Sequence, residues 1–283
     1  MDNAPTREPG IISRRGTGRI SVALVAGQSA LLSALANSPL KILVPRPRGP
    51  SVWAYLSSFG GGLVAGDETR LDLAVGSGAS CFLSTQSSTK VYRNRAGLPC
   101  GQELAAQLAP GSLLILAPDP VQAFAGAAYR QRQQFQMAAT SGLVVVDWLS
   151  AGRAACGERW IFEHYASRTE VFLENRRVFL DSLCLDPRDG PAEVASRMGR
   201  FNCLALVLVL GDPLREAANR VLQEIAARPV TRRAPLVLAA SAHPHGVVLR
   251  LAGESIETVG REIQRCLAFV PALLQDDPWF RKW

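Results

Sequence analysis

The chain has 283 residues, 48% of them apolar, and a formal net charge of +7. This apolar content is enough for a sizeable core, and β-rich chains of this length often fold as one domain. The excess of basic residues is almost entirely arginine, scattered without a charged stripe interleaved with aromatic residues, which argues against a nucleic-acid-binding protein.

The spacing of the cysteines and the length of the apolar runs indicate in which cellular compartment the protein works. The six cysteines show no Cys-x-x-Cys spacing, and a chain with this much core does not need a disulfide framework. The first ten residues lack the basic start and apolar segment of a signal peptide. The longest apolar run, 203–211, is too short to span a bilayer. We therefore expect a reduced, cytoplasmic protein without a membrane partner.

Short strands are predicted along the chain from residue 11 to about 190. Apolar residues alternate with polar ones, and Gly, Pro, Asn or Asp separate the segments, which is typical of β-structure. In one strand the alternation places Arg130 and Arg132 on one face and Phe135 and Met137 on the other, so a wet, arginine-bearing face is predicted. The predicted strands are 20–28, 51–59, 70–76, 79–86, 112–118, 129–137, 142–150 and 170–185.

Residues 60–67 read GGGLVAGD, so mostly small residues precede the carboxylate of Asp67. A phosphate-binding loop would need a following Lys-Ser or Lys-Thr pair or a helix N-terminus, whereas the residues after Asp67 alternate as a strand. Glycine supplies positive φ angles or room for a second backbone. The segment is therefore predicted to be a glycine-lined bend, with Asp67 opening the next strand.

The pattern changes in the C-terminal third, where a β-α-β-β-α portion is predicted over 200–275. Asp212 at an N-cap followed by Pro213 is a typical helix start. No Pro- or Ser-rich linker precedes this portion, so we expect it to pack onto the β-rich body, 11–190, within a single domain, 11–283. The expected elements are a buried strand over 201–211, a helix over 212–228, strands near 235–240 and 246–252, and a helix over 254–274.

Catalytic motifs are sparse in this sequence. No Gly-x-Ser-x-Gly nucleophile elbow occurs, and two of the three histidines form a His-Pro-His turn with no third metal ligand nearby. Polar residues do interrupt apolar strands, among them Asp119 and Asp147. A buried carboxylate is costly unless it is paired. One interpretation is therefore that Arg93, Arg153 and Arg159 neutralise these carboxylates as structural ion pairs.

Four motifs follow one another between residues 60 and 160: GGGLVAGD, STQSSTKVYR, PDPVQAFAGAAYRQ and DWLSAGRAACGERW. In this order they resemble the urease accessory protein UreD family, also called UreH. The family pattern has Gly-Gly-Leu-Val-x-Gly-Asp, a Thr-Thr-Gln run ending in Lys-Val-Tyr-Arg, Pro-Asp-Pro-x-x-x-Phe ending in Tyr-Arg-Gln, and Gly-Arg-x-x-x-Gly-Glu-x-Trp. Ser84 replaces the usual Thr and Ala65 a frequent Gly, and neither change removes a charged group.

The resemblance implies a mainly β fold: an irregular, right-handed β-helical stack of short strands, with two α-helices in a C-terminal α/β portion. It also implies that the protein is not an enzyme. The implied function is that of a urease accessory protein, which acts with UreF and, through UreF, with the GTPase UreG to insert nickel into urease apoprotein. No permanently bound cofactor is expected, and nickel is expected only in transit.

A transit site for nickel should bind weakly, and carboxylates and hydroxyls suit this because softer donors hold nickel firmly. On this hypothesis Asp67 faces an internal passage. The candidate transit residues are Asp67, Ser87, Asp119, Asp147, Glu158 and Asp181. For UreF, the aromatic C-terminal segment supplies exposed apolar anchors. These candidates are Phe269, Val270, Leu273, Trp279, Phe280 and Trp283.

Two alternatives stay open. A purely structural adaptor would bridge urease and UreF without conducting metal. A β-helical carbohydrate-active enzyme would use paired carboxylates, for which Asp67 and Asp147 are one such pair. Nickel-dependent activation of urease separates the accessory protein from the enzyme, and only a measurement of nickel transfer separates the conduit from the adaptor.

Overall fold

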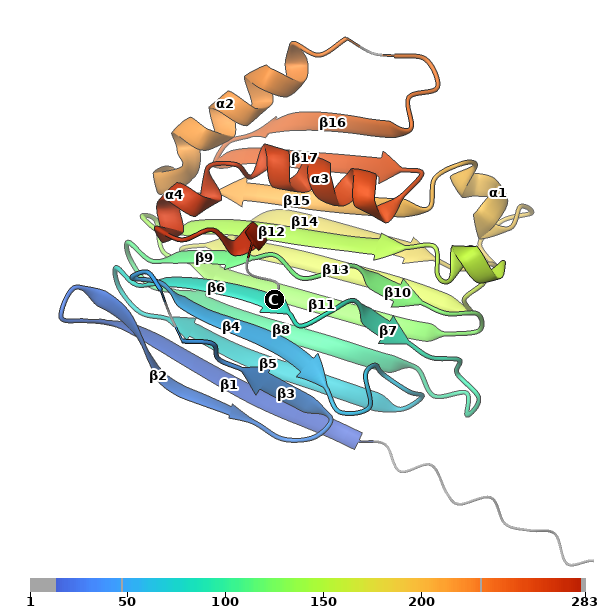
Figure 1. Cartoon of the computed structure of the whole chain (residues 1–283), viewed down its shortest axis with the longest axis horizontal. Helices are drawn as coiled ribbons and strands as arrows, with labels where there is room; N and C mark the ends of the chain where they lie inside the picture. Colours follow the sequence, from blue (N-terminus) through green and yellow to red (C-terminus); the bar gives the residue numbers. More distant parts are fainter. Residues whose placement is uncertain (1–13, 47, 230, 281–283) are drawn as a thin grey trace, which may run out of the picture.

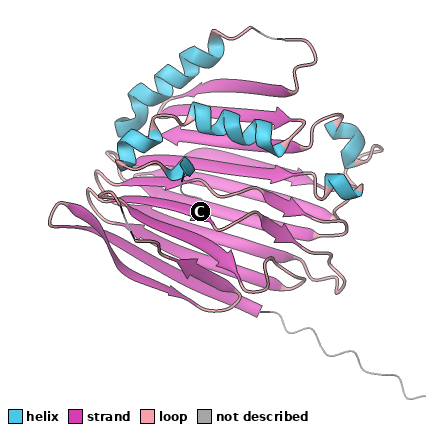
Figure 2. Ribbon diagram, in the orientation of Figure 1, coloured by secondary structure: helices cyan, strands magenta, loops and turns pink. Residues whose placement is uncertain are grey.

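The computed structural model describes residues 14–46, 48–229 and 231–280. Within this part of the chain, strands form two sheets that pack face to face, and the helices after residue 210 lie on one side of the larger sheet (Figure 1, Figure 2). The seven-stranded sheet has the order β14-β13-β11-β8-β5-β1-β2. The ten-stranded sheet has the order β16-β17-β15-β12-β9-β6-β4-β3, with β10 paired to β12 and to β7.

The centre of the molecule is a stack of coils in which the chain passes alternately from one sheet to the other. Each strand pairs in parallel with the strand of the preceding coil. The mainly β, stacked architecture is therefore confirmed. The strands of the ten-stranded sheet are β4 (Val52–Ser58), β6 (Ser80–Thr85), β9 (Leu113–Leu116) and β12 (Gly142–Ser150), and those of the seven-stranded sheet are β5 (Asp67–Val75), β8 (Cys100–Leu108), β11 (Ala128–Met137) and β13 (His164–Leu173).

Antiparallel hairpins complete both ends of the seven-stranded sheet. The single strand predicted over 170–185 is wrong, because Glu174 and Asn175 have φ angles of 48° and 65° and form the turn between β13 and β14. At the other end, β1 pairs with β2 and, in parallel, with β5. The remaining strands of this part are β1 (Arg14–Val25), β2 (Gln28–Ala36), β3 (Leu40–Leu43), β7 (Thr89–Val91), β10 (Val121–Ala123) and β14 (Arg176–Leu185).

The C-terminal portion continues the ten-stranded sheet, since β15 pairs antiparallel with β12 and is followed by β17 and β16. The helix predicted over 254–274 is divided into α3 and α4, because Pro271 cannot continue a helix interior. The N-cap predicted at Asp212 is also wrong: Asp212–Leu214 form a 3₁₀ turn before α2. The elements are α1 (Val194–Met198), β15 (Cys203–Leu210), α2 (Arg215–Ala226), β16 (Leu236–His243), β17 (Gly246–Gly253), α3 (Ile256–Cys266) and α4 (Val270–Leu274).

Apolar side chains cover both sides of the ten-stranded sheet. Its outer side packs against the helices through a cluster that includes Val207 and Val259. Its inner side packs against the seven-stranded sheet, whose inward residues Leu73, Phe135 and Val171 belong to a second cluster. These three residues come from the C-terminal halves of their strands. In the N-terminal halves of the same strands, polar residues take the inward positions, and this polar part of the layer is the candidate site.

Candidate functional site

Four inward-facing polar side chains lie side by side across the seven-stranded sheet. Thr69 on β5 is opposite Gln102 on β8, Gln102 is opposite Gln131 on β11, and Gln131 is opposite Ser167 on β13. Because these strands are parallel and in register, each of four consecutive coils contributes one side chain to the same row. We call Thr69, Gln102, Gln131 and Ser167 the polar row. It runs along the stack, across the direction of the strands.

Asp147 faces the polar row from the ten-stranded sheet. Its neighbours Val146 and Trp148 point to the helix side, so the alternation of strand β12 directs Asp147 between the sheets. Gln131 Nε2 donates a hydrogen bond to Asp147 Oδ1 over 2.9 Å, and Ser167 Oγ donates to Asp147 Oδ2 over 2.6 Å. Burial raises the pKa of Asp147, and the two hydrogen bonds oppose this rise.

More oxygen atoms surround the polar row. The Tyr129 hydroxyl lies 2.7 Å from Gln102 Oε1 and 3.0 Å from Gln131 Oε1. The Tyr165 hydroxyl and Thr169 Oγ1 are buried and make no hydrogen bond within the described part of the chain. Buried polar atoms without partners are uncommon in folded proteins. The layer therefore holds two buried oxygen atoms whose hydrogen bonds the described part of the chain does not satisfy.

A hollow lies at each end of the polar row. At the Ser167 end, a hollow of about 200 Å³ is lined by Asp147, Asp181 and Arg250 together with apolar residues. At the Thr69 end, a hollow of about 40 Å³ is lined mainly by hydroxyl-bearing side chains. These hydroxyl residues are Ser57, Ser58, Thr69, Thr85, Ser87, Ser88 and Thr89.

Three of the six predicted transit residues line these hollows. Asp147 and Asp181 share the larger hollow, and Ser87 lines the smaller one. Asp181 on β14 also forms an ion pair of 2.7 Å with Arg250 on β17, which ties the two sheets together at this end. The charge of Asp181 is thus already matched, whereas Asp147 receives only neutral donors.

Asp67 lies beside the polar row, buried at the start of β5. Its carboxylate accepts a hydrogen bond of 3.0 Å from the backbone N–H of Val64 and so closes the glycine bend. The bend itself is confirmed, and it uses glycine in both expected ways. Gly66 has a φ of 81°, and a Cβ atom at Gly62 would lie 2.7 Å from the backbone carbonyl oxygen of Lys90.

Asp119 and Glu158 are not members of the polar row, although Asp119 accepts a hydrogen bond of 3.2 Å from Thr85, which lines the smaller hollow. Asp119 lines a separate hollow of about 180 Å³ with Trp148 and Trp279, on the helix side of the ten-stranded sheet. Glu158 accepts a hydrogen bond of 2.9 Å from Arg153 Nε, and this ion pair lowers the pKa of Glu158. The interpretation that an arginine neutralises a carboxylate structurally therefore holds for Glu158.

The predicted UreF-binding residues are unevenly exposed. Val270 does not have the expected exposure: it is fully buried, because the start of α4 packs into the core between the helices and the ten-stranded sheet. Trp283 lies outside the described residues. Binding of UreF by this segment stays a prediction. Leu273 and Phe280 are 38% and 87% exposed, whereas Phe269 and Trp279 are partly buried against the same core.

Sequence reasoning missed the polar row as a unit. The inward position of Gln131 follows from the alternation in 129–137, but segment 100–108 was not predicted as a strand, so Gln102 had no place in the sheet. The available signal was the recurrence of polar residues at inward positions of neighbouring strands. Strand register, which aligns them, is a tertiary property.

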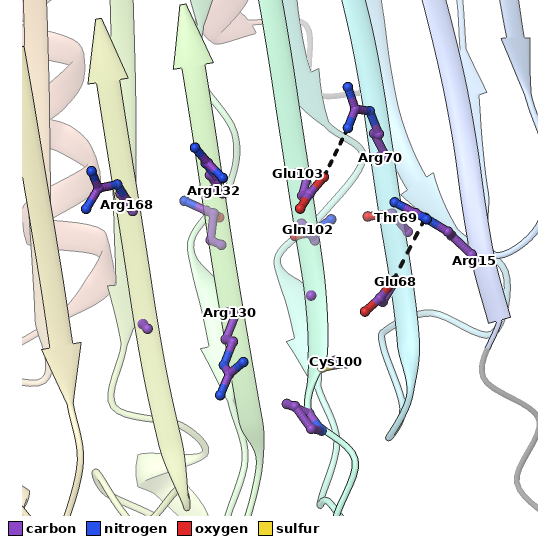
Figure 3. A pocket seen from close by; sticks show the side chains of 14 residues that line it. Arg15, Glu68, Thr69, Arg70, Cys100, Gln102, Glu103, Arg130, Arg132 and Arg168 are labelled. Atoms are coloured by element: carbon purple, nitrogen blue, oxygen red, sulfur yellow. Dashed lines mark hydrogen bonds and ion pairs between the residues drawn. The ribbon is translucent and has the colours of Figure 1, made fainter. Parts of the chain in front are cut away.

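The opposite face of the seven-stranded sheet is charged. Figure 3 shows arginines from β1, β5, β11 and β13 around a hollow of about 560 Å³, with Glu68 and Glu103 between them. Beside this hollow, Glu170 on β13 is buried under Arg168, Arg132 and Arg177, which lie 3.0, 3.5 and 3.2 Å from it. Hydrogen bonds from Arg168, above all, lower the pKa of Glu170 to about 2.

Residues 14–46, 48–229 and 231–280 contain neither a cluster of metal ligands nor a membrane-spanning helix. Nowhere in these ranges do three His, Cys, Asp or Glu side chains gather as a metal site. No helix within the same ranges has the length and apolar character needed to cross a bilayer.

Comparison with known proteins identifies the family. The model of the UreD urease accessory protein family matches residues 14–283. The chain belongs to this family. It is 44% identical over 277 residues to the urease accessory protein UreD of Anaeromyxobacter sp. (strain Fw109-5), a match that covers 98% of this chain and 92% of the relative.

Two further relatives support the same assignment. Urease accessory protein UreD of Sorangium cellulosum (strain So ce56) is 46% identical over 271 residues, covering 95% of this chain and 85% of the relative. Urease accessory protein D of Arabidopsis thaliana is 33% identical over 294 residues, covering 93% and 99%. The resemblance carried by the four motifs is confirmed. UreD proteins are urease accessory proteins by name, and membership implies a role in urease maturation.

Proposed function

We propose that this UreD protein acts in the cytoplasm with UreF and UreG to insert nickel into urease apoprotein, and that nickel passes along the polar row between its two sheets. Nickel is here the cargo and not a resident cofactor. The observation that carries the proposal is Asp147, a carboxyl placed between two sheets, opposite a row of oxygen-bearing side chains and next to a hollow.

The ligand chemistry supports transit better than storage. The side chains around Asp147 offer hydroxyl, amide and carboxyl oxygens, which bind nickel less firmly than imidazole or thiolate groups. A cargo ion must enter and leave, so weak ligands in series suit it. The hollows at the two ends of the row give the ion an entrance and an exit in this scheme.

Asp147 would act as the charged step along this path. Burial raises its pKa, so the carboxyl takes up a proton more readily than an exposed aspartate does. A divalent cation beside it favours the carboxylate form. Arrival of nickel at Asp147 would therefore favour loss of any proton that the carboxyl carries, and uptake of a proton would favour departure of the ion.

The competing function is a structural adaptor that joins urease to UreF without conducting metal. Two observations favour it: Asp181 is paired with Arg250, and Glu158 is paired with Arg153. Both of these candidates are explained by structure alone. Asp147 has no arginine partner among the described residues, so it is the residue at which the two functions make different predictions.

The test replaces Asp147 with asparagine, which keeps the volume and removes the charge. We expect the complex with UreF, UreG and urease apoprotein to form normally. Nickel incorporation into urease should slow by about fivefold or more, because loss of a charge near the ion in a partly buried site costs at least about 1 kcal/mol of Coulomb energy. Pull-down, bound nickel and urease activity are measured on the same sample.

Asp72→Asn is the matched control, since Asp72 lies on the outer face of the seven-stranded sheet, away from the polar row, and pairs with Arg70. Gln131→Met is a second variant within the row, and slower nickel incorporation is expected for it as well. An intact complex with normal nickel in Asp147→Asn refutes passage past this residue. Parallel loss of the complex and of nickel supports the adaptor.

A further inference from the structure

The outer face of the seven-stranded sheet has an arrangement of charge that passage of nickel does not use. Its hollow of about 560 Å³ is lined by five arginines against two glutamates (Figure 3). Clustered guanidinium groups repel one another, so a face of this kind is stabilised when a partner supplies carboxylates. The five arginines are Arg15, Arg70, Arg130, Arg132 and Arg168, and the glutamates are Glu68 and Glu103.

The register of the strands explains why this face is hollowed. In one row, Arg130 lies between Gly101 and Ala166, which provide almost no side chain. In the next row, Glu103, Arg132 and Arg168 lie side by side. The small residues leave a trough next to a wall of charged side chains. The hollow of about 560 Å³ is large enough for a short peptide segment and not only for a single side chain.

The arginines of this face are incompletely neutralised. Arg130 forms no ion pair with any described residue, and Arg70 reaches Glu103 over a long 3.5 Å contact. Arg132 and Arg168 share the single carboxylate of Glu170 with a third arginine. Planar guanidinium groups bind carboxylates in a bidentate manner. The face therefore has unused capacity for carboxylates of a partner.

The chemistry favours an acidic protein segment over a nucleic acid. None of the described residues that line the hollow is aromatic, so nothing on this face would stack on bases. Glu68 and Glu103 also interrupt the positive charge, which would repel a continuous phosphate backbone but fits a peptide that carries separate carboxylates.

We propose that this arginine-lined trough binds an acidic, extended surface segment of urease apoprotein. The choice of partner rests on the proposed function, in which UreD helps to insert nickel into urease apoprotein. The trough lies on the opposite side of the sheet from the polar row. Docking through it is therefore separable from transfer of nickel past Asp147.

The test changes Arg130 and Arg132 to glutamate together in the full chain, expressed with UreF. The matched control is Arg232→Glu with Arg233→Glu, an exposed arginine pair in the loop between α2 and β16, which gives the same change in net charge. Affinity for immobilised urease apoprotein should fall about tenfold or more in the Arg130/Arg132 variant, because like charges now face each other. The control should stay within about twofold of the natural chain.

Two competitors identify the chemistry of the occupant. Poly-L-glutamate should displace urease apoprotein from the natural chain, and displacement should weaken as salt rises from about 0.05 to 0.5 M. Polyuridylate should displace it much less. Equal displacement by polyuridylate overturns the assignment in favour of a nucleic-acid surface.

The remaining outcomes are also decisive. If the natural chain with UreF binds urease apoprotein and the Arg130/Arg132 variant binds equally well, the trough is not the docking surface, while the proposed function stands. Loss of UreF binding together with urease binding in this variant also overturns the assignment to urease. If the natural chain itself does not bind urease apoprotein, both the proposed function and this inference fail.

Discussion

Strand β11 presents two different environments with one run of residues. Its inward positions pass from Gln131 in the polar row to Phe135 in the apolar core, while Arg130 and Arg132 face the charged trough. Successive side chains of a strand point to opposite faces. One strand therefore contributes at once to the core, to the polar row and to the outer surface.

The inner and outer sides of the seven-stranded sheet shift the pKa of a carboxyl group in opposite directions. Between the sheets, burial with only neutral donors raises the pKa of Asp147. On the outer side, three arginines cover Glu170 and lower its pKa to about 2. Glu170 is buried and Asp147 is partly buried. The comparison shows that the partner, more than the burial, decides which protonation state the fold favours.

The largest change in stability is expected from a substitution in the apolar part of the layer between the two sheets. Phe135→Ala should lower the free energy of unfolding by about 3–5 kcal/mol, because it removes a fully buried ring between two sheets that cannot both collapse onto the cavity. Urea denaturation measures this loss. A loss below about 1 kcal/mol would mean that the sheets repack and that the inner layer is not tightly filled.

The next effect is expected on the outer face. Glu170→Gln should lower the midpoint of thermal unfolding at pH 7 by a few degrees, since solvent screens the half-exposed arginines. The folded-state pKa of Glu170 lies below the ordinary value of 4.5, so its contribution to stability is fully present above pH 4.5 and is lost as pH falls towards about 2. The difference between the two proteins should shrink over that interval. Glu103→Gln, at a half-exposed carboxylate, is the control and should change little.

A smaller effect of opposite sign is expected at Asp147. Its raised pKa means that the folded state binds the proton more tightly, so the natural chain loses stability as pH rises above the ordinary aspartate pKa of 3.8. Asp147→Asn removes that loss and should unfold at a higher temperature than the natural chain at pH 7. The gain should disappear at pH below 3.8. A destabilised variant at pH 7 would show that the ionised carboxylate is structurally required.

The smallest effect is expected at Arg130. Arg130→Ala should change the free energy of unfolding by no more than about 0.5 kcal/mol, because this exposed side chain has no ion-pair partner in the described part of the chain. Arg130 and Phe135 lie on the same strand, so the two substitutions compare an outward with an inward side chain. A larger loss in urea denaturation would mean that the trough stabilises the fold itself, and would weaken its role as a docking surface.

Much of the fold followed from local patterns. Alternation predicted the strand over 142–150 at its observed bounds and the two-faced character of 129–137. Segment 100–108 was not predicted to be a strand, because its alanines and glutamines carry little β-propensity. Only pairing with β5 and β11 makes it a strand. For the site, the sequence picked out Asp147 as a polar residue within an apolar strand, but it picked out Asp119 and Glu158 on the same ground, and these lie elsewhere.

The sequence by itself determined the family, the mainly β character and the faces of individual strands, because motifs and alternation are local properties that do not depend on which strands are neighbours. The tertiary structure alone decided that Thr69, Gln102, Gln131 and Ser167 form one row opposite Asp147. It also decided which carboxylates have arginine partners. Both depend on the register between coils that are distant in sequence, and a shift of one residue would exchange the inner and outer faces.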